Sequence, residues 1–362
     1  ESEKKTSKKE AGPQTIYLII AGFLVLAAII LIITYMALKS GNNTKKTPQV
    51  PVTTPTPTTP VKKELTIFDE NSNDRPIAVM IDNAIGDAKH AGLQESYLNY
   101  EIIVEGGITR IMAIYKDKDV SLIGPVRSSR HYFLDYALEN DAIYVHFGAS
   151  KQALEDINTL KIDNINFINY NTGYWRDTTL NLSMEHTAFT SSELINNGIE
   201  KYEYRKTTNN KPIINYTEEE IDLSKKDNSI KADKVYIDYS ASRDTTYTYD
   251  EENKVYLRIQ GTAKGNYKHI DGVTNKQYTV KNIITYKVKN KSLDDKDRQE
   301  LYNIGSGEGY YITNGYAIPI KWEKKDRASK TIYKYLDGEE IKVNDGNTFI
   351  QIQPENRELI IS

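Results

Sequence analysis

The feature that most constrains this chain is a stretch of 23 uncharged, largely apolar residues at positions 16–38. Coiled as a helix at about 1.5 Å per residue, it reaches roughly 35 Å, which exceeds the hydrocarbon core of about 30 Å in a typical bilayer. A cleaved signal peptide has a shorter apolar stretch and a small-residue cleavage site, whereas this stretch runs directly into Lys39. It predicts an uncleaved transmembrane helix over residues 16–38, preceded by a short tail at residues 1–15.

The composition changes to proline and threonine within residues 39–64, where five prolines stand among seven threonines. Such a segment stays extended and solvated, and twenty residues at about 3 Å each hold a domain up to roughly 60 Å from a surface. We therefore expect a stalk. Four lysines precede the apolar stretch and three follow it, so the flanking charges orient the helix only weakly. The stalk favours a single-pass cell-membrane protein with a cytoplasmic N-terminus and extracellular C-terminal domains; the alternative is a cytoplasmic linker.

The composition also excludes several kinds of function. The chain has no cysteine, so disulfides, thiolate metal sites, cysteine nucleophiles and cysteine-linked lipid anchors are all ruled out. From residue 65 onward, 38 basic residues face 46 acidic ones, which disfavours nucleic acid as a partner. The common phosphate-loop, serine-hydrolase and zinc-helix motifs are missing. We accordingly expect no cofactor and no metal.

The sequence after the stalk shows two different patterns. Residues 65–205 alternate short apolar runs with helical periods, a pattern typical of an α/β domain with a largely parallel or mixed sheet. After a polar joint at residues 206–230, residues 231–362 carry short strands and hairpin dipeptides such as Asn314-Gly315. We expect an antiparallel β domain there, as a sandwich or open barrel, and an α+β chain overall. The strands expected in the first domain are 77–81, 102–104, 111–115, 120–123 and 142–147, and its expected helices are 129–138 and 150–160.

The most informative segment is Gly124-Pro125-Val126-Arg127-Ser128-Ser129-Arg130, where a turn leaves an expected strand and enters an expected helix. A helix start presents free backbone N–H groups and favours negative charge. The guanidiniums of Arg127 and Arg130 pair bidentately with phosphate or carboxylate, so with the Ser128 hydroxyl they predict an anion-binding site. The alternative interpretation is that both arginines pair with carboxylates inside the protein, namely Asp82, Glu105 or Asp135.

Several polar residues follow the ends of expected strands. Open α/β sheets bind ligands at the carboxyl edge of their strands, so parallel strands would gather these residues on one rim, whereas antiparallel strands would scatter them. The residues expected to bind a ligand at this rim are Asp82, Asn83, Glu105, Arg110, Arg127, Ser128 and Arg130. The candidates for acid–base catalysis are His146, His186 and Glu105.

Eight short segments carry a resemblance to a known family. They are 75–83 (RPIAVMIDN), 105–110 (EGGITR), 123–130 (IGPVRSSR), 144–148 (YVHFG), 247–250 (YTYD), 269–272 (HIDG), 281–284 (KNII) and 345–352 (DGNTFIQI). In this order they resemble the YerB-like envelope proteins over about residues 65–355. The resemblance implies a bacterial, mainly Gram-positive, extracytoplasmic protein of two domains, and it implies no particular reaction.

The chain departs from that family in two places. Family members are commonly lipoproteins anchored through a cysteine, whereas this chain has no cysteine and carries the apolar stretch 16–38 instead. Where the family is expected to read Ala-Pro-His-Asn, this chain reads Ser-Met-Glu-His-Thr at residues 183–187. Only His186 corresponds.

Three hypotheses about function follow from these observations. The leading one is a membrane-anchored, extracytoplasmic envelope protein that binds an anionic or glycan ligand of the cell wall or membrane at its α/β domain. The alternative is an envelope hydrolase or transferase in which a histidine acts as base or acid, a carboxylate orients it and the arginines neutralise developing charge. The second alternative is a noncatalytic scaffold for envelope proteins.

Overall fold

The computed structural model describes residues 26–36, 63–86 and 90–362. Lys62–Ser362 form one compact unit, in which many strands combine with few, short helices. The predicted α+β class is confirmed.

The predicted membrane helix falls mostly outside the described residues. Of positions 16–38, only residues 26–36 are described, and these are helical. No helix among the described parts of the chain is long and apolar enough to span a membrane. The tail at 1–15 and all but the last two residues of the stalk at 39–64 also lie outside the described residues, so the anchor and the stalk stay predictions.

The larger sheet is mixed and has eleven strands within the described residues. Their bounds are β1 Ile77–Asn83, β2 Leu98–Ile103, β3 Thr109–Tyr115, β4 Ile143–His146, β5 Asn164–Asn166, β9 Ile230–Lys231, β15 Asn282–Val288, β18 Gly305–Thr313, β19 Tyr316–Lys324, β20 Ile332–Tyr335 and β22 Thr348–Pro354. They follow the order β20-β19-β18-β15-β22-β2-β3-β1-β4-β5, with β9 beside β19. Because β1 pairs in parallel with β4, and both β1 and β2 are antiparallel to β3, the strands β1, β2 and β4 all point the same way. Their carboxyl ends therefore lie at one edge of the sheet.

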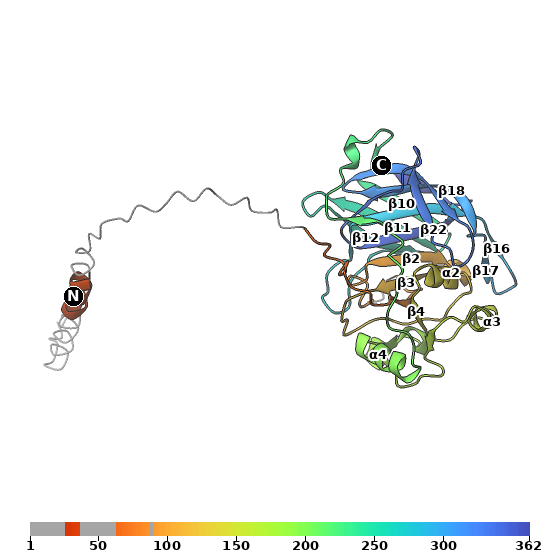
Figure 1. Cartoon of the computed structure of the whole chain (residues 1–362), viewed down its shortest axis with the longest axis horizontal. Helices are drawn as coiled ribbons and strands as arrows, with labels where there is room; N and C mark the ends of the chain where they lie inside the picture. Colours follow the sequence, from red (N-terminus) through yellow and green to blue (C-terminus); the bar gives the residue numbers. More distant parts are fainter. Residues whose placement is uncertain (1–25, 37–62, 87–89) are drawn as a thin grey trace, which may run out of the picture. The chain divides into compact units, whose positions relative to one another are not determined.

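The second sheet has six strands within the described residues, and all its pairs are antiparallel. Its strands are β10 Lys234–Ser240, β11 Arg243–Asp250, β12 Val255–Thr262, β13 Gly265–Lys268, β14 Thr279–Val280 and β23 Leu359–Ile361. The α-helices of this unit are α2 Phe133–Glu139, α3 Lys151–Thr159 and α4 Ser192–Lys201. In Figure 1, α3 and α4 lie toward the end of the unit near β4, while β10, β11 and β12 lie toward the opposite end.

One sheet runs through both sequence segments. β2 pairs in parallel with β22, so that Leu98 lies opposite Thr348. The C-terminal segment thus does not close into a sandwich or barrel of its own, because it adds β15, β18, β19, β20 and β22 to the larger sheet. The boundaries at 65–205, 206–230 and 231–362 stay a prediction.

Local patterns predicted several elements correctly. The apolar run 77–81 is β1, which is buried along nearly its whole length because both faces are covered. Ser150 caps α3, as expected, by accepting a 3.3 Å hydrogen bond from the backbone N–H of Ala153. Asn314 and Gly315 have φ of 50° and 76° and join β18 to β19 in a tight reversal, as their dipeptide predicts.

Two expectations near residues 120–130 are wrong. Residues 120–123 form no strand, and the helix expected from residue 129 begins only at Phe133. The reason is that this segment makes isolated bridges to different neighbours, with Ile123 against Thr190, Val126 against Ile81 and Ser129 against Ala149. Its backbone groups pair with the surrounding strands and loops, so they do not pair within a helix.

Candidate functional site

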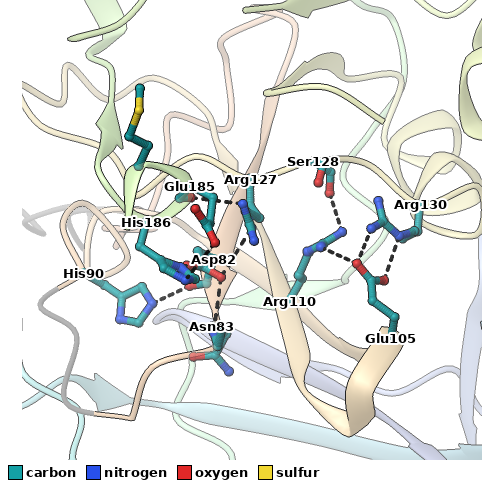
Figure 2. Close-up of polar contacts among 12 residues, drawn as sticks. Asp82, Asn83, His90, Glu105, Arg110, Arg127, Ser128, Arg130, Glu185 and His186 are labelled. Atoms are coloured by element: carbon teal, nitrogen blue, oxygen red, sulfur yellow. Dashed lines mark hydrogen bonds and ion pairs between the residues drawn. The ribbon is translucent and has the colours of Figure 1, made fainter. Parts of the chain in front are cut away.

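The predicted rim forms at the carboxyl ends of β1 and β2. Asp82 lies directly opposite Arg110 in the antiparallel pairing of β1 with β3, so both side chains project from the same face. Glu105 follows β2 in the single turn Glu105–Gly107. Figure 2 shows Arg110 between these two carboxylates, with Arg127 and Arg130 beside them. Because β1 and β2 run in the same direction, Asp82 and Glu105 lie at one edge of the sheet, as the sequence argument required, and Arg110 joins them from the antiparallel strand β3.

Glu105 holds two of the three arginines. Its carboxylate accepts a 2.8 Å bond from Nη2 of Arg110, a 2.8 Å bond from Nε of Arg130 and a third bond from Nη2 of Arg130. Although burial favours the neutral acid, these bonds and charges hold the pKa of Glu105 at about 2. Arg110 also donates a 2.8 Å bond to the Ser128 carbonyl. The arrangement gives Arg130 an internal carboxylate partner, which is the role that the alternative interpretation described, and Arg110 shares that partner.

Asp82 forms a second group with His186 and Arg127. Nδ1 of His186 is hydrogen-bonded to Oδ2 of Asp82, and Nε of Arg127 lies 3.8 Å from Oδ1. Burial opposes ionisation of Asp82, but the bond and charge of His186 and the charge of Arg127 lower the pKa of that carboxyl below its ordinary value. Arg127 donates a 3.2 Å bond to the Glu185 carbonyl. Its Nε is buried and has no hydrogen-bond partner among the described residues.

Backbone pairing places Arg127 in this group. The segment that contains it continues along the end of β1, where Asp82 N–H donates to Pro125 O at 2.8 Å and Arg127 N–H donates to Met80 O at 2.9 Å. On its other side, Phe147 N–H donates to Arg127 O at 3.0 Å. The segment therefore lies between the ends of β1 and β4. Arg127 is therefore positioned by a loop and not, as the sequence had predicted, by the start of a helix.

Three of the expected site residues lie elsewhere or contribute differently. His146 is fully buried, and its Nδ1 and Nε2 face Gly148 O at 2.8 Å and Asn164 Oδ1 at 3.2 Å; burial lowers its pKa. Asn83 follows Asp82 in the strand and so projects from the opposite face, where its amide nitrogen donates to Glu101 Oε1 at 3.0 Å. Ser128 contributes its carbonyl oxygen to Arg110.

Sequence reasoning missed the polar residues beneath the rim. Glu101 and Arg258 are fully buried and form a 2.7 Å ion pair, and His90 and His269 are buried against each other. The alternation of buried and partly exposed residues along β12 places Arg258 on the buried face, together with the residues two positions before and after it. The strand pattern could therefore have identified Arg258 as a buried arginine. His90 carried no such signal, because its partner lies 179 positions away.

Comparisons with known proteins identify the family. Residues 64–205 match the N-terminal domain, and residues 235–350 the C-terminal domain, of a family described as "Protein of unknown function (DUF3048)". The chain belongs to the DUF3048 family. A member from Bacillus subtilis (strain 168), described as "Putative lipoprotein YerB", is 25% identical over 285 residues, which cover 78% of this chain and 82% of the relative. The predicted resemblance to YerB-like proteins is thus confirmed.

A solved structure supports the DUF3048 fold. The crystal structure of YerB from Bacillus subtilis matches this chain with a TM-score of 0.69 at 22% identity, and the match covers 83% of this chain and 100% of that one. At this identity the likeness shows the fold alone. Within the described part of the chain, no three His, Asp or Glu side chains are grouped to hold a metal ion.

Proposed function

We propose that this DUF3048 protein is an envelope-associated binding protein whose ligand presents an anionic group, such as a phosphate or carboxylate on an envelope glycan, to Arg127 and His186. The observation that carries the proposal is the partly exposed guanidinium of Arg127, which has five N–H donors and gives one of them to the Glu185 carbonyl. Its Nε–H is buried without a partner, as is that of Arg110, so an anion at the rim would accept from the solvent-facing N–H groups of Arg127.

The contrast among the arginines supports the choice of Arg127. Arg110 and Arg130 each bond to Glu105 at 2.8 Å or closer, whereas the ion pair of Arg127 with Asp82 spans 3.8 Å. The Arg127 side chain is 24% exposed, against 3% for Arg110. Arg127 therefore combines spare bonding capacity with access to solvent.

His186 offers the second contact. An ionised carboxylate accepts hydrogen bonds only, so the Nδ1 that faces Asp82 carries a proton. When the ring is protonated, Nε2 becomes a second donor, which a bound anion would share with the Glu185 carboxylate 3.9 Å away. The side chain is 14% exposed and lies beside Arg127 in Figure 2.

The proposal places these domains outside the cell. It is supported by the lipoprotein description of the relative from Bacillus subtilis and by the apolar stretch at 16–38, which would serve as a single-pass anchor with the N-terminus in the cytoplasm. Protease added to intact, wall-stripped cells should cut the stalk and release a fragment from near Leu65 to Ser362. Protection of the whole chain until the membrane is permeabilised would contradict this topology.

Binding is tested directly with solubilised cell-wall fragments and glycolipid phosphates. The whole chain and Arg127→Ala are titrated in parallel, and Arg127→Ala should lose at least about tenfold in affinity, since a charge-assisted hydrogen bond contributes about 1.5–3 kcal/mol. Arg205→Ala is the matched control, because Arg205 is 50% exposed and pairs with Asp141. Equal affinity of Arg127→Ala and the unmodified chain, or no binding of any fragment, would refute the proposal.

One observation favours catalysis as a second candidate. The Asp82 carboxylate orients His186 through Nδ1, and Nε2, which lies 3.9 Å from Oε1 of Glu185, can accept a proton when the ring is neutral, as a general base requires. Mass spectrometry of the same wall fragments would detect turnover. Products that disappear in His186→Gln would favour an enzyme, while binding without any change in mass would favour a binding protein.

A further inference from the structure

A chain of buried hydrogen bonds runs from the second sheet to the rim. We call it the buried relay, and it joins Glu101, Arg258, His269, His90 and Asp82. Nη2 of Arg258 lies 2.7 Å from Glu101 Oε2, and Nη1 of Arg258 bonds to Nδ1 of His269. Nε2 of His269 lies 2.7 Å from Nδ1 of His90. Nε2 of His90 bonds to the backbone oxygen of Asp82, the contact that Figure 2 shows at the left of the site.

Elementary chemistry fixes the direction of every bond in the buried relay. A guanidinium only donates, so Nδ1 of His269 must be unprotonated and accept from Arg258. The proton of neutral His269 is then on Nε2 and is donated to Nδ1 of His90. His90 in turn carries its proton on Nε2 and donates it to the Asp82 carbonyl, which only accepts. A single pair of tautomers satisfies all three bonds.

Burial agrees with this assignment. The side chains of Glu101 and Arg258 are fully inaccessible, and His90 and His269 are 1% and 0% exposed. Burial, aided by the charge of Arg258, keeps the pKa of His269 well below its ordinary value and lowers that of His90 to about 4. Both rings are therefore neutral at pH 7, which is required because each ring donates through one nitrogen and accepts through the other.

The buried relay connects parts of the chain that are distant in sequence. Arg258 lies in β12 and His269 just after β13, whereas Asp82 is the last residue but one of β1 in the larger sheet. His90 is fixed by a backbone bridge to Asp271, and its carbonyl accepts a 2.6 Å bond from Gly272 N–H. The second sheet thus reaches the rim through His90.

A neighbouring set of bonds holds the next residue of β1. Asn83 donates to Glu101 Oε1 at 3.0 Å and to Thr109 Oγ1 at 2.7 Å, and its carbonyl accepts from Arg243. The last two residues of β1 are accordingly anchored from the interior at both the carbonyl of Asp82 and the side chain of Asn83. The Asp82 carboxylate remains directed to His186.

We propose that Arg258, His269 and His90 are positioning residues of the candidate site, which hold the Asp82 backbone from the second sheet and thereby set the geometry of the Asp82–His186 pair. The importance of that pair rests on the proposed function, but its geometry does not. The C-terminal segment would then be part of the site although none of these three residues reaches the ligand. Measurements on the ligand-free chain separate failure of this proposal from failure of ligand binding.

The first test is the tautomer of each ring in the whole chain, labelled with ¹⁵N only in histidine. Long-range ¹H–¹⁵N correlation spectra, assigned with single His→Gln variants, distinguish a protonated from an unprotonated ring nitrogen. At pH 7, His90 and His269 should both carry the proton on Nε2. A proton on Nδ1 of either ring, or a charged ring, would overturn the proposal without any need for a variant.

The second test asks whether the buried relay sets the Asp82–His186 pair. In His269→Gln the side-chain oxygen accepts from Arg258 and the amide donates to His90, so the bond directions are kept; in His269→Phe they are lost. The readout is the Nδ1 proton resonance of His186, which should persist in His269→Gln and be lost or shifted in His269→Phe. Tyr278→Phe is the control, since Tyr278 packs on His269 with ring centroids 4.5 Å apart but bonds to Asp271, and its spectrum should keep the resonance. An unchanged His186 resonance in folded His269→Phe, or loss of that resonance in Tyr278→Phe, would overturn the positioning role. If His269→Phe does not fold, the tautomer measurement tests the proposal instead.

Discussion

Arg130 and Arg127 are held so differently that replacing each by alanine should affect the free energy of unfolding to different extents. Arg130 donates twice to Glu105 and once to Ser129 O at 2.6 Å. Losing one partner of a buried ion pair costs about 3–5 kcal/mol, whereas an exposed pair contributes about 1 kcal/mol or less. The Glu105 side chain is 26% exposed and keeps Arg110 as a partner, so we expect Arg130→Ala to lower the free energy of unfolding by about 2–3 kcal/mol.

Arg127→Ala should cost less. Asp82 keeps its bond to His186, and the lost contacts are a 3.8 Å ion pair and one 3.2 Å hydrogen bond. We expect a loss of about 1 kcal/mol or less. Because Arg127 is the proposed ligand contact, its replacement should weaken binding much more than it weakens the fold.

Urea unfolding followed by circular dichroism at pH 7 measures both changes, provided that the slope of the transition stays constant. Arg205→Ala is the control for an exposed arginine and should remain within about 0.5 kcal/mol of the unmodified chain. In thermal unfolding, Arg130→Ala should lower Tm by roughly 4–6 °C, near the lower end of the shift per kcal/mol known for large domains. A loss of less than about 0.5 kcal/mol in Arg130→Ala, or a larger loss in Arg127→Ala than in Arg130→Ala, would contradict the contacts assigned to the two arginines.

Two further perturbations test other parts of the account. The pKa of Glu105 is depressed to about 2 in the folded chain, so its contribution to the free energy of unfolding is fully present above its ordinary pKa and is lost as the pH falls toward 2. Between pH 6 and pH 2 the urea midpoint should therefore fall more steeply for the unmodified chain than for Glu105→Gln. Parallel pH profiles of the two proteins would contradict this. Glu101→Gln leaves Arg258 fully buried without a charged partner and should cost about 3–5 kcal/mol. Calorimetric unfolding of the Glu101 variant measures that loss, and a change below about 1 kcal/mol would show that the pair is not held as described.

Local sequence patterns predicted the elements whose cause is local. A continuous apolar run predicts β1 because both of its faces are covered, and the Ser150 cap predicts the start of α3 because the capping bond lies within one turn. The position of Asp82 and Glu105 at one edge was expected as well, because residues at the carboxyl ends of strands that run the same way share an edge; Arg127 reaches Asp82 from a loop and not from the expected strand.

Features that depend on distant partners were not predictable in this way. The pairing of β2 with β22 joins residues about 250 positions apart, and no local periodicity specifies such a pairing. The late start of α2 has the same origin, since bridges to Ile81 and Ala149 hold Val126 and Ser129 outside a helix. The expected role of Asn83 overlooked the two-residue period of a strand, which turns neighbouring side chains to opposite faces.

The most direct test of the proposed binding site is to locate the ligand on the chain. Histidine ring signals are recorded while a wall fragment or glycolipid phosphate that binds is added to the whole chain. We expect the ring signals of His186 to shift in a saturable way, because its Nε2 would contact the bound anion. The ring signals of His146, which is fully buried against Gly148 and Asn164, should stay unchanged. Saturable binding that leaves His186 unchanged, or that shifts His146 instead, would contradict the assignment of the site.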